Sequence, residues 1–358
     1  MIPPVDVSDH GESSPTARPK LSVVLIYRSP TRGGFSIENV FSSVVPHLSE
    51  RAEVTEYFLQ SKWGGLRDVI QLLRLRADVY HITGDVHYMA LFLPRRRTVL
   101  TVNDTYYLEN ATRGLKRRVY KLFWFDLPLR LSARITAISS VTGDSVATIS
   151  GRRVMRKMQI VPCPVHPVFV PRAGPPVHAR PRLLFVGTAD HKNLTRVISA
   201  ISGVDCELAI IGTLSSDAIR QLGSSGIIYS NYVGLDISQV YKHYTDADVL
   251  VFPSLREGLG LPILEAQAVG VPVVTSNIPP MNEVAGRGAC LVDPLDAASI
   301  RAGILRVISD SGFRNALVIA GRSNARSYTA DAVADKFMSV YEQLPSASKV
   351  HALRRVDV

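Results

Sequence analysis

The segment FPSLREGLGLPILEAQAVGVPVV (residues 252–274) carries two carboxylates at a spacing that suits recognition of a sugar. Glu257 lies in a glycine-rich turn after an apolar run, and Glu265 lies further on in an expected helix. An ionised carboxylate is an acceptor only and can take two hydroxyls of a polyol in a bidentate contact. The pattern therefore predicts one glutamate on a loop and one on a helix, holding two rings of one ligand. The alternative makes Glu257 a helix-start charge and Glu265 an ordinary helix residue.

Glycine and proline shape the turn between these glutamates. Gly258 and Gly260 let the backbone come close to a ligand, and Pro262 suits the first turn of a helix. The free N–H groups at such a helix start can bind an anion. We therefore expect this turn to hold a ligand that carries both hydroxyls and negative charge.

Short apolar runs alternate with helical patterns along the chain, which is typical of parallel α/β sheets. We expect strands at 20–26, 78–83, 98–102, 134–138, 160–161, 182–186, 207–211, 248–252 and 271–275. We expect helices at 36–48, 139–149 with Ser139 as the cap, 193–200, 237–245, 262–269, 297–309 and 330–344. Ligands bind beyond the carboxyl ends of such strands, so the loops that follow them are expected to line the site.

Seven prolines between residues 162 and 181 interrupt this alternation and predict a stiff connector. We therefore expect a disordered tail at 1–20, a Rossmann-like domain at 21–165, a proline-rich linker at 166–181 and a second Rossmann-like domain at 182–327. The fold class is α/β, with two doubly wound domains facing each other across a cleft.

Composition excludes several classes of protein. The 358 residues are 46% hydrophobic, which excludes wholesale disorder and allows two packed domains. The three cysteines are far apart and form no C-x-x-C pair, so neither a disulfide framework nor a zinc site is expected. The first twenty residues lack a signal-peptide core, and no apolar run approaches the ~18 residues of a spanning helix. We expect a cytoplasmic protein, with the inner face of the cytoplasmic membrane as a second setting.

The net charge of +10 lies almost wholly in residues 1–170, which hold 23 Lys and Arg against 14 Asp and Glu. Basic residues gather at 95–97 and 113–121, and the second group runs into LFWFDLPLRL (122–131). Such a segment fits an anionic membrane surface, and it fits equally a solvated helix face. Nucleic acid is not an expected partner, because no nucleic-acid motif accompanies the charge.

The segment from Glu257 to Glu265 resembles the two-glutamate signature of the retaining group 1 (family four) glycosyltransferases. The resemblance continues in FVGTADHKNL (185–194), ITAIS (135–139), HITGDVH (81–87) and the Gly33-Gly34 loop. It implies the GT-B fold, with the nucleotide-sugar donor in the C-terminal domain and the acceptor mostly in the N-terminal domain. It also implies that the last helix, 328–345, crosses back to the first domain.

The resemblance assigns roles by position. Glu265 holds the ribose hydroxyls, Glu257 approaches the transferred sugar, and Lys192 faces the diphosphate, where a fixed cation stabilises the departing group. Arg196 stands in for a second cation that the family often carries near this loop. The further expected donor contacts are Gly258, Leu259, Gly260, Leu261, Gly187, Thr188, Gly33 and Gly34.

Asn103 departs from the family pattern. The family commonly carries histidine before the residue that matches Asp104, and asparagine can hydrogen-bond but cannot shuttle a proton. We count Asn103 as a catalytic candidate and expect His87, rather than His81, to compensate.

The resemblance predicts a retaining, metal-independent hexosyltransferase without a cofactor, in which the departing diphosphate deprotonates the acceptor. The segment around Gly187 and Lys192 looks most like mannosyltransferases, and bacterial surface polysaccharide synthesis is the expected setting. Expected partners are a nucleotide sugar, a glycan or lipid-linked acceptor, and an anionic membrane. The ribose contact is common to UDP, GDP and ADP, so the donor base stays open. Two alternatives remain: a GT-B nucleotide-sugar epimerase, and a transferase-like subunit that binds without turnover.

Overall fold

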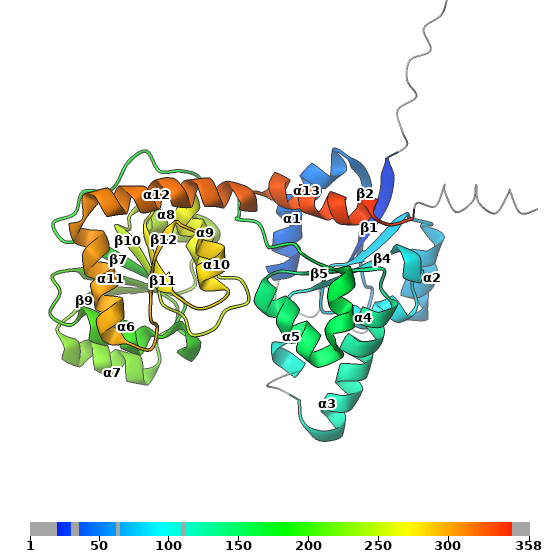
Figure 1. The fold of residues 1–358 in the computed structure, drawn as a ribbon, viewed down its shortest axis with the longest axis horizontal. Helices are drawn as coiled ribbons and strands as arrows, with labels where there is room; N and C mark the ends of the chain where they lie inside the picture. Colours follow the sequence, from blue (N-terminus) through cyan, green and yellow to red (C-terminus); the bar gives the residue numbers. More distant parts are fainter. Residues whose placement is uncertain (1–19, 30–35, 62–64, 109–111, 346–358) are drawn as a thin grey trace, which may run out of the picture.

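The structure is a computed structural model that describes residues 20–29, 36–61, 65–108 and 112–345. Two six-stranded sheets form two lobes that lie side by side (Figure 1). This confirms the expected α/β class with two parallel sheets. Nearly all of the predicted tail, together with Gly33 and Gly34, lies outside the described residues.

The N-terminal sheet has the strand order β2-β1-β3-β4-β5-β6, with all pairs parallel. Its strands are β1 (Leu21–Tyr27), β2 (Ala52–Phe58), β3 (Val79–Ile82), β4 (Thr98–Val102), β5 (Arg134–Ala137) and β6 (Met158–Ile160). Its helices are α1 (Ser36–Ser49), α2 (Leu66–Arg74), α3 (Gly114–Tyr120), a π-helical turn (Lys121–Asp126), α4 (Leu127–Leu131) and α5 (Ser140–Ser150). As expected, Ser139 caps α5, since its Oγ accepts the Thr142 N–H at 3.1 Å.

The C-terminal sheet has the order β12-β11-β10-β7-β8-β9. Its strands are β7 (Arg182–Val186), β8 (Glu207–Ile211), β9 (Ile228–Tyr232), β10 (Val249–Phe252), β11 (Val273–Ser276) and β12 (Ala289–Val292). Its helices are α6 (Leu194–Ile201), α7 (Ser216–Ser225), α8 (Ile237–Thr245), α9 (Leu261–Val269), α10 (Met281–Ala285), α11 (Ala297–Ser309) and α12 (Ser311–Ala325). The central strands are buried along their length because helices cover both faces of a parallel sheet.

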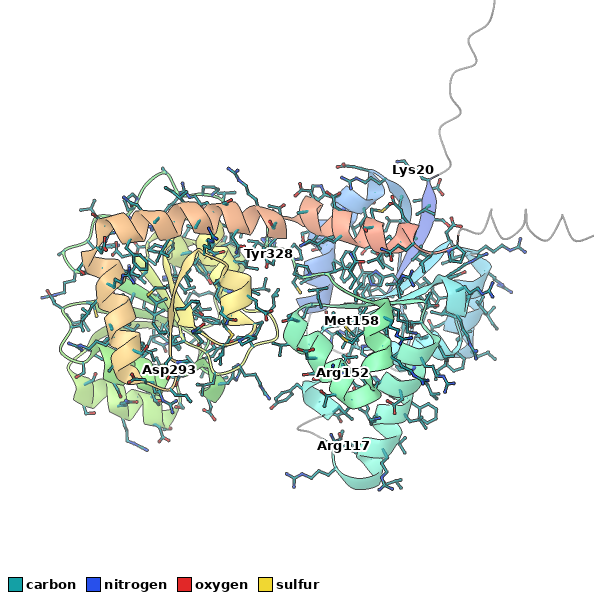
Figure 2. The ribbon with its side chains drawn as sticks, in the orientation of Figure 1. Lys20, Arg117, Arg152, Met158, Asp293 and Tyr328 are labelled. Carbon is teal, nitrogen blue, oxygen red and sulfur yellow. The ribbon has the colours of Figure 1, made fainter. Side chains whose placement is uncertain are left out.

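The chain crosses between the lobes twice. The last helix, α13 (Ala330–Glu342), follows α12 across the top of Figure 1 and packs its apolar side on β1 and α1 of the N-terminal lobe. At the crossing, the Val165 N–H donates to the Tyr328 carbonyl at 2.8 Å. Figure 2 marks Tyr328 between the lobes.

The proline-rich segment is more than a spacer. Phe169, inside the predicted linker, is buried in the C-terminal core, and its ring meets Tyr244 edge-on with centroids 5.3 Å apart. The segment therefore packs on the C-terminal lobe, because one large apolar side chain anchors it.

Three contacts bring the carboxyl ends of the two sheets together. Ser140 on α5 hydrogen-bonds to Glu283 on α10. The guanidinium of Arg256 lies 5.1 Å from the ring centroid of Tyr106. A β-carbon at Gly258 would lie only 3.4 Å from the Ile138 side chain. The segments that follow β4, β5, β10 and β11 therefore contact one another between the lobes.

Candidate functional site

Glu265 lies on α9, and Tyr244 fixes one of its carboxylate oxygens. The Tyr244 hydroxyl donates to Glu265 Oε2 at 2.6 Å. Burial raises the pKa of Glu265 to about 7, against the opposing effects of that hydrogen bond and of the Lys192 charge. The carboxyl group is therefore about half ionised near neutral pH and mostly ionised above it. The sequence predicts no role for Tyr244, because no pattern relates its position to that of Glu265.

Lys192 and Glu257 form a partly buried ion pair. Lys192 Nζ lies 2.7 Å from Glu257 Oε1, and the side chains are only 16% and 11% exposed. The ammonium also lies 4.6 Å from the centroid of the Phe252 ring, within range of a cation–π contact. The cation expected at a diphosphate and the carboxylate expected at a sugar thus neutralise each other in this state.

The loop after β7 is built to place Lys192. Gly187 has φ = +85°, which glycine adopts without strain, and a β-carbon there would lie 2.9 Å from Lys192 Cε, so a larger residue would displace the lysine side chain. Gly187 therefore shapes the site through the lysine. Thr188 turns away, since its hydroxyl donates to the Thr213 carbonyl at 2.6 Å.

Asn193 joins this loop to the loop that carries Glu257. Its amide nitrogen donates to the carbonyls of Pro253 at 3.0 Å and Pro294 at 2.7 Å, and it adopts a left-handed backbone with φ = +71°. The amide oxygen accepts from Arg196 at 2.8 Å. The proposed second cation is therefore held at the start of α6, next to Lys192 in sequence. Sequence analysis did not identify this positioning role of Asn193.

The glycine turn closes the C-terminal half of the site. Gly260 has φ = +96°, which glycine adopts without strain, and α9 begins at the next residue, Leu261. Leu259 is buried in the C-terminal core and anchors the turn. A β-carbon at Gly258 would lie 3.9 Å from the Asn103 carbonyl, so this turn lies directly beside the N-terminal half.

A cavity of about 250 Å³ forms the N-terminal half of the site. Asn103 and His87 both line it. Asn103 Nδ2 donates to the Thr83 carbonyl at 3.1 Å, and His87 Nδ1 donates to the Trp124 carbonyl at 2.7 Å. Burial lowers the pKa of His87, so its imidazole is neutral at pH 7. The other lining residues are Arg28, Asp85, Asp104, Thr105, Tyr107, Leu108, Tyr120, Trp124 and Phe125.

His81 lies apart from this cavity. Its two ring nitrogens contact the Tyr341 and Thr101 hydroxyls, each at 2.7 Å, and burial lowers its pKa to about 3. His81 therefore ties α13 to the N-terminal sheet and has a structural role. The compensating role expected of His87 stays a prediction.

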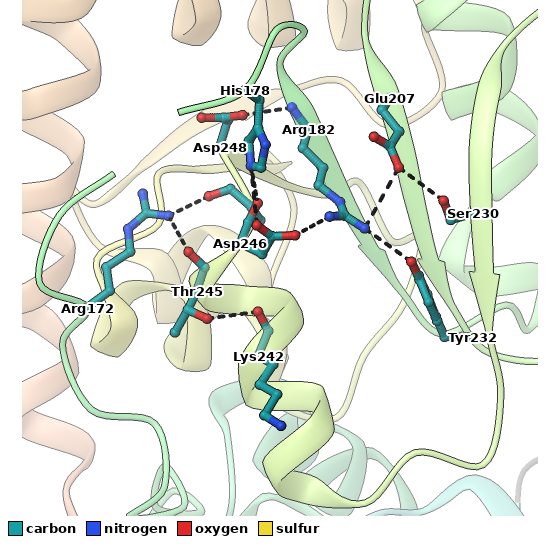
Figure 3. Close-up of polar contacts among 11 residues, drawn as sticks. Arg172, His178, Arg182, Glu207, Ser230, Tyr232, Lys242, Thr245, Asp246 and Asp248 are labelled. Atoms are coloured by element: carbon teal, nitrogen blue, oxygen red, sulfur yellow. Dashed lines mark hydrogen bonds and ion pairs between the residues drawn. The ribbon is translucent and has the colours of Figure 1, made fainter. Parts of the chain in front are cut away.

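Asp246 and Asp248 lie at the other end of β10, away from the glycine turn. Figure 3 shows Asp248 accepting the Arg182 N–H, a bond of 2.8 Å, and Asp246 paired with the Arg182 guanidinium. Among the residues that the structure describes, no group of three or more His, Cys, Asp and Glu is arranged to hold a metal ion. These two aspartates fix the start of β7 against β10.

Comparison with known proteins finds similarity mainly in the C-terminal lobe. Residues 180–310 match the family model described as glycosyl transferases group 1. Over 101 residues, 28% of this chain and 26% of the relative, the chain is 37% identical to O-antigen chain mannosyltransferase B of Escherichia coli. Over 257 residues, 64% of this chain and 59% of the relative, it is 28% identical to the MMP alpha-(1->4)-mannosyltransferase of Mycolicibacterium hassiacum. The chain thus spans less than two thirds of the length of either curated relative.

The solved structures agree on the fold. The structure of Anabaena HepE in complex with UDP and glucose matches 90% of this chain and 100% of that chain, with a TM-score of 0.66 at 14% identity. The two facing α/β lobes are therefore those of the GT-B fold. Residues 180–310 thus form a domain that matches the group 1 glycosyltransferases, and the named relatives are themselves glycosyltransferases.

Proposed function

We propose that this protein is a retaining glycosyltransferase that moves a hexose, with mannose favoured, from a nucleotide sugar to a glycan or lipid-linked acceptor. One observation carries the proposal: Lys192, Glu257 and Glu265 converge on the turn at Gly258, which lies beside Asn103. Both curated relatives named above are mannosyltransferases, which favours mannose and a role in surface polysaccharide or glycolipid synthesis.

In this proposal, Glu265 accepts the ribose hydroxyls and Tyr244 fixes the carboxylate for that contact. The donor diphosphate takes the Lys192 ammonium from Glu257. Glu257 is then free to accept hydroxyls of the transferred sugar. Binding thus replaces the Lys192–Glu257 ion pair by two new charged contacts. These contacts offset the free-energy cost of separating Lys192 from Glu257.

The reaction exchanges one bond to the anomeric carbon for another. The bond between this carbon and the diphosphate oxygen breaks, and the acceptor oxygen bonds to the carbon from the same face. The acceptor proton passes to the departing diphosphate. Lys192 stabilises the charge that grows there, a role that a metal fills in other transferases. Asn103 and neutral His87 serve as hydrogen-bonding groups for the sugar or acceptor.

A basic helix on the N-terminal lobe supports a membrane-bound acceptor. On α3 and the π-helical turn, Leu115 is 75% exposed, and Val119, Leu122 and Phe123 are 40–49% exposed. Basic residues lie beside this stripe on α3, among them the exposed Arg117 that Figure 2 labels. Apolar residues at helical spacing beside cations suit an anionic lipid surface. No helix among the described residues is long and apolar enough to cross a membrane.

The membrane proposal is tested by flotation with vesicles of neutral and anionic lipid. We expect binding to anionic vesicles only, and roughly tenfold less binding for a Leu115→Ser, Phe123→Ser variant. Ile319→Ser, which changes an equally exposed residue on α12, is the matched control. Equal binding by all three proteins would favour the solvated helix face.

The donor site is tested by calorimetry with GDP-mannose, UDP-glucose and ADP-glucose. We expect one of them to bind, and we expect Glu265→Ala to weaken this binding roughly 100-fold, because two hydroxyl contacts to a charged group are lost. Glu342→Ala changes an exposed carboxylate on α13 and serves as the control. No binding by the folded parent would contradict the donor assignment. Donor binding without transfer or epimerisation would favour the binding subunit, to which Asn103 points.

A further inference from the structure

A second and larger cavity lies at the opposite end of the C-terminal sheet from the glycine turn. Its volume is about 590 Å³, and it is bounded by residues 172–178 of the proline-rich segment, the starts of β7 and β10, and α12. We call it the hinge pocket, because residues 172–178 follow the first crossing between the lobes and α12 leads into the second. None of the residues of the proposed donor site lines it.

Three guanidinium groups line the hinge pocket, from Arg172, Arg314 and Arg322. Arg172 donates to the carbonyls of Ala247 at 2.6 Å and Thr245 at 3.2 Å, as Figure 3 shows. Arg314 donates to carbonyls at the end of α11, and Arg322 donates weakly to the Arg172 carbonyl at 3.4 Å. Within the described ranges, no carboxylate lies at ion-pair distance from any of the three.

Arg182 has carboxylate partners, whereas the three arginines of the hinge pocket have none among the described residues. Its guanidinium, close by in Figure 3, pairs with Asp246 and lies 3.8 Å from Glu207. In the hinge pocket, Asp248 is the one lining carboxylate among the described residues, and it already accepts the Arg182 N–H. Three cations therefore face one carboxylate. Burial lowers the pKa of Arg172; the Asp248 charge opposes this shift, and the nearby Arg322 charge adds to it because like charges repel.

An anion in the pocket would relieve this repulsion. Guanidinium forks match phosphate oxygens in charge and geometry. The remaining wall is apolar and includes Pro175, Pro176 and Val318, which leaves room for an organic portion of the ligand. The volume falls within the range of small-molecule sites.

We propose that the hinge pocket binds a small phosphate-bearing molecule through Arg172, Arg314 and Arg322. The ligand contacts both connections between the lobes, because Arg172 follows the first crossing and Arg322 precedes the second. The site is separate from the transfer reaction and does not depend on the function proposed above.

The test uses inorganic pyrophosphate as the probe and calorimetry as the measurement. The proposed donor site would bind the same probe, so the full-length Lys192→Gln variant is the background. We expect pyrophosphate to bind this variant at one site and orthophosphate to bind more weakly. Adding Arg322→Gln is expected to weaken pyrophosphate binding roughly tenfold or more, since a charge-assisted contact is lost.

Two controls make the result decisive. Arg220→Gln, on the same background, removes an exposed arginine of α7 that does not line the hinge pocket, and it should leave the binding unchanged. Arg314→Gln should weaken binding as Arg322→Gln does, with the thermal unfolding of each unliganded variant showing that it is folded. No pyrophosphate site on the Lys192→Gln background, or equal weakening by Arg220→Gln, would overturn the proposal. Failure of the donor site alone would leave it intact.

Discussion

Each lobe has its own sheet of six parallel strands, yet the two lobes hold their site residues by different interactions. In the C-terminal lobe, side chains are partnered with each other: Lys192 with Glu257 in an ion pair, and Tyr244 with Glu265 in a hydrogen bond. In the N-terminal lobe, Asn103 and His87 are neutral and are held by backbone carbonyls. Under the proposed function, donor binding would separate the Lys192–Glu257 ion pair, whereas Asn103 and His87 would contact their ligand without a change in ion pairing.

The strongest test of this contrast is Lys192→Ala. It should lower kcat/KM roughly 100-fold, because the departing diphosphate loses a charge-assisted contact and Glu257 is left buried without its partner. Steady-state transfer kinetics would measure the loss. Lys242→Ala, at an exposed end of α8, is the control, and Lys192→Arg should restore part of the rate. A Lys192→Ala enzyme with normal kinetics would remove the charge exchange from the mechanism.

Glu265→Gln should raise the free energy of unfolding at pH 8 while it weakens donor binding. Burial raises the folded-state pKa of Glu265 to about 7, so the stability from its protonated form is present below the ordinary value of 4.5 and is lost as pH rises through 7. A neutral glutamine avoids that loss and should raise the free energy of unfolding at pH 8 by about 1–3 kcal/mol. Denaturant unfolding at pH 8 and pH 4.5 would show a gain that vanishes in acid. Donor binding should fall at the same time; a variant that is less stable at pH 8 would contradict the assignment.

The same carboxyl group predicts how donor affinity depends on pH. Only the ionised form accepts both ribose hydroxyls, so affinity should be constant above about pH 8 and weaken by up to about tenfold per unit below 7. Tyr244→Phe removes a hydrogen bond that lowers the pKa of Glu265, so its transition should lie at higher pH. Tyr241→Phe, whose hydroxyl contacts the Val170 carbonyl instead, should behave like the parent. Calorimetry between pH 6 and 8.5 checks this, and a flat profile would refute it.

The smallest expected effect comes from Asn103, which lines the cavity of the N-terminal lobe. Asn103→His should raise the transfer rate a few-fold, since imidazole adds a group that can exchange protons. Donor affinity should stay unchanged because the substitution lies in the N-terminal lobe. Asn103→Gln keeps the amide and is the matched control. A rise from no activity to measurable activity would identify the parent as a binding subunit.

The central strands could be predicted closely, whereas the edges could not. The strands 98–102, 182–186 and 207–211 have the predicted bounds, because burial on both faces requires continuous apolar runs. The strands β2, β9 and β12 went unpredicted. They lie at sheet edges, where exposed positions carry polar residues such as those of AEVTEYF. Helix α12 was missed as well, since SGFRNALVIAGRSNA mixes small and polar residues without a clear apolar stripe.

The site was predicted in part for a related reason. Glycine, proline and glutamate types near residue 260 indicated a sugar-binding turn, and the structure places Lys192 beside it. The partners of these groups lie far away in sequence: Lys192 pairs across 65 positions, and Asn193 bridges to Pro294 across 101. Such contacts depend on the tertiary fold, and no local sequence pattern predicts them.

The return of α13 to the first lobe has a consequence for biosynthesis. The ribosome completes the N-terminal sheet at Ile160, yet Phe337 and Tyr341, which cover β1 and His81, are made about 180 residues later. Until then, α1 alone covers this part of the sheet, without α13. The first lobe therefore reaches its final packing only when the end of the chain arrives, so the order of synthesis and the order of completion are reversed.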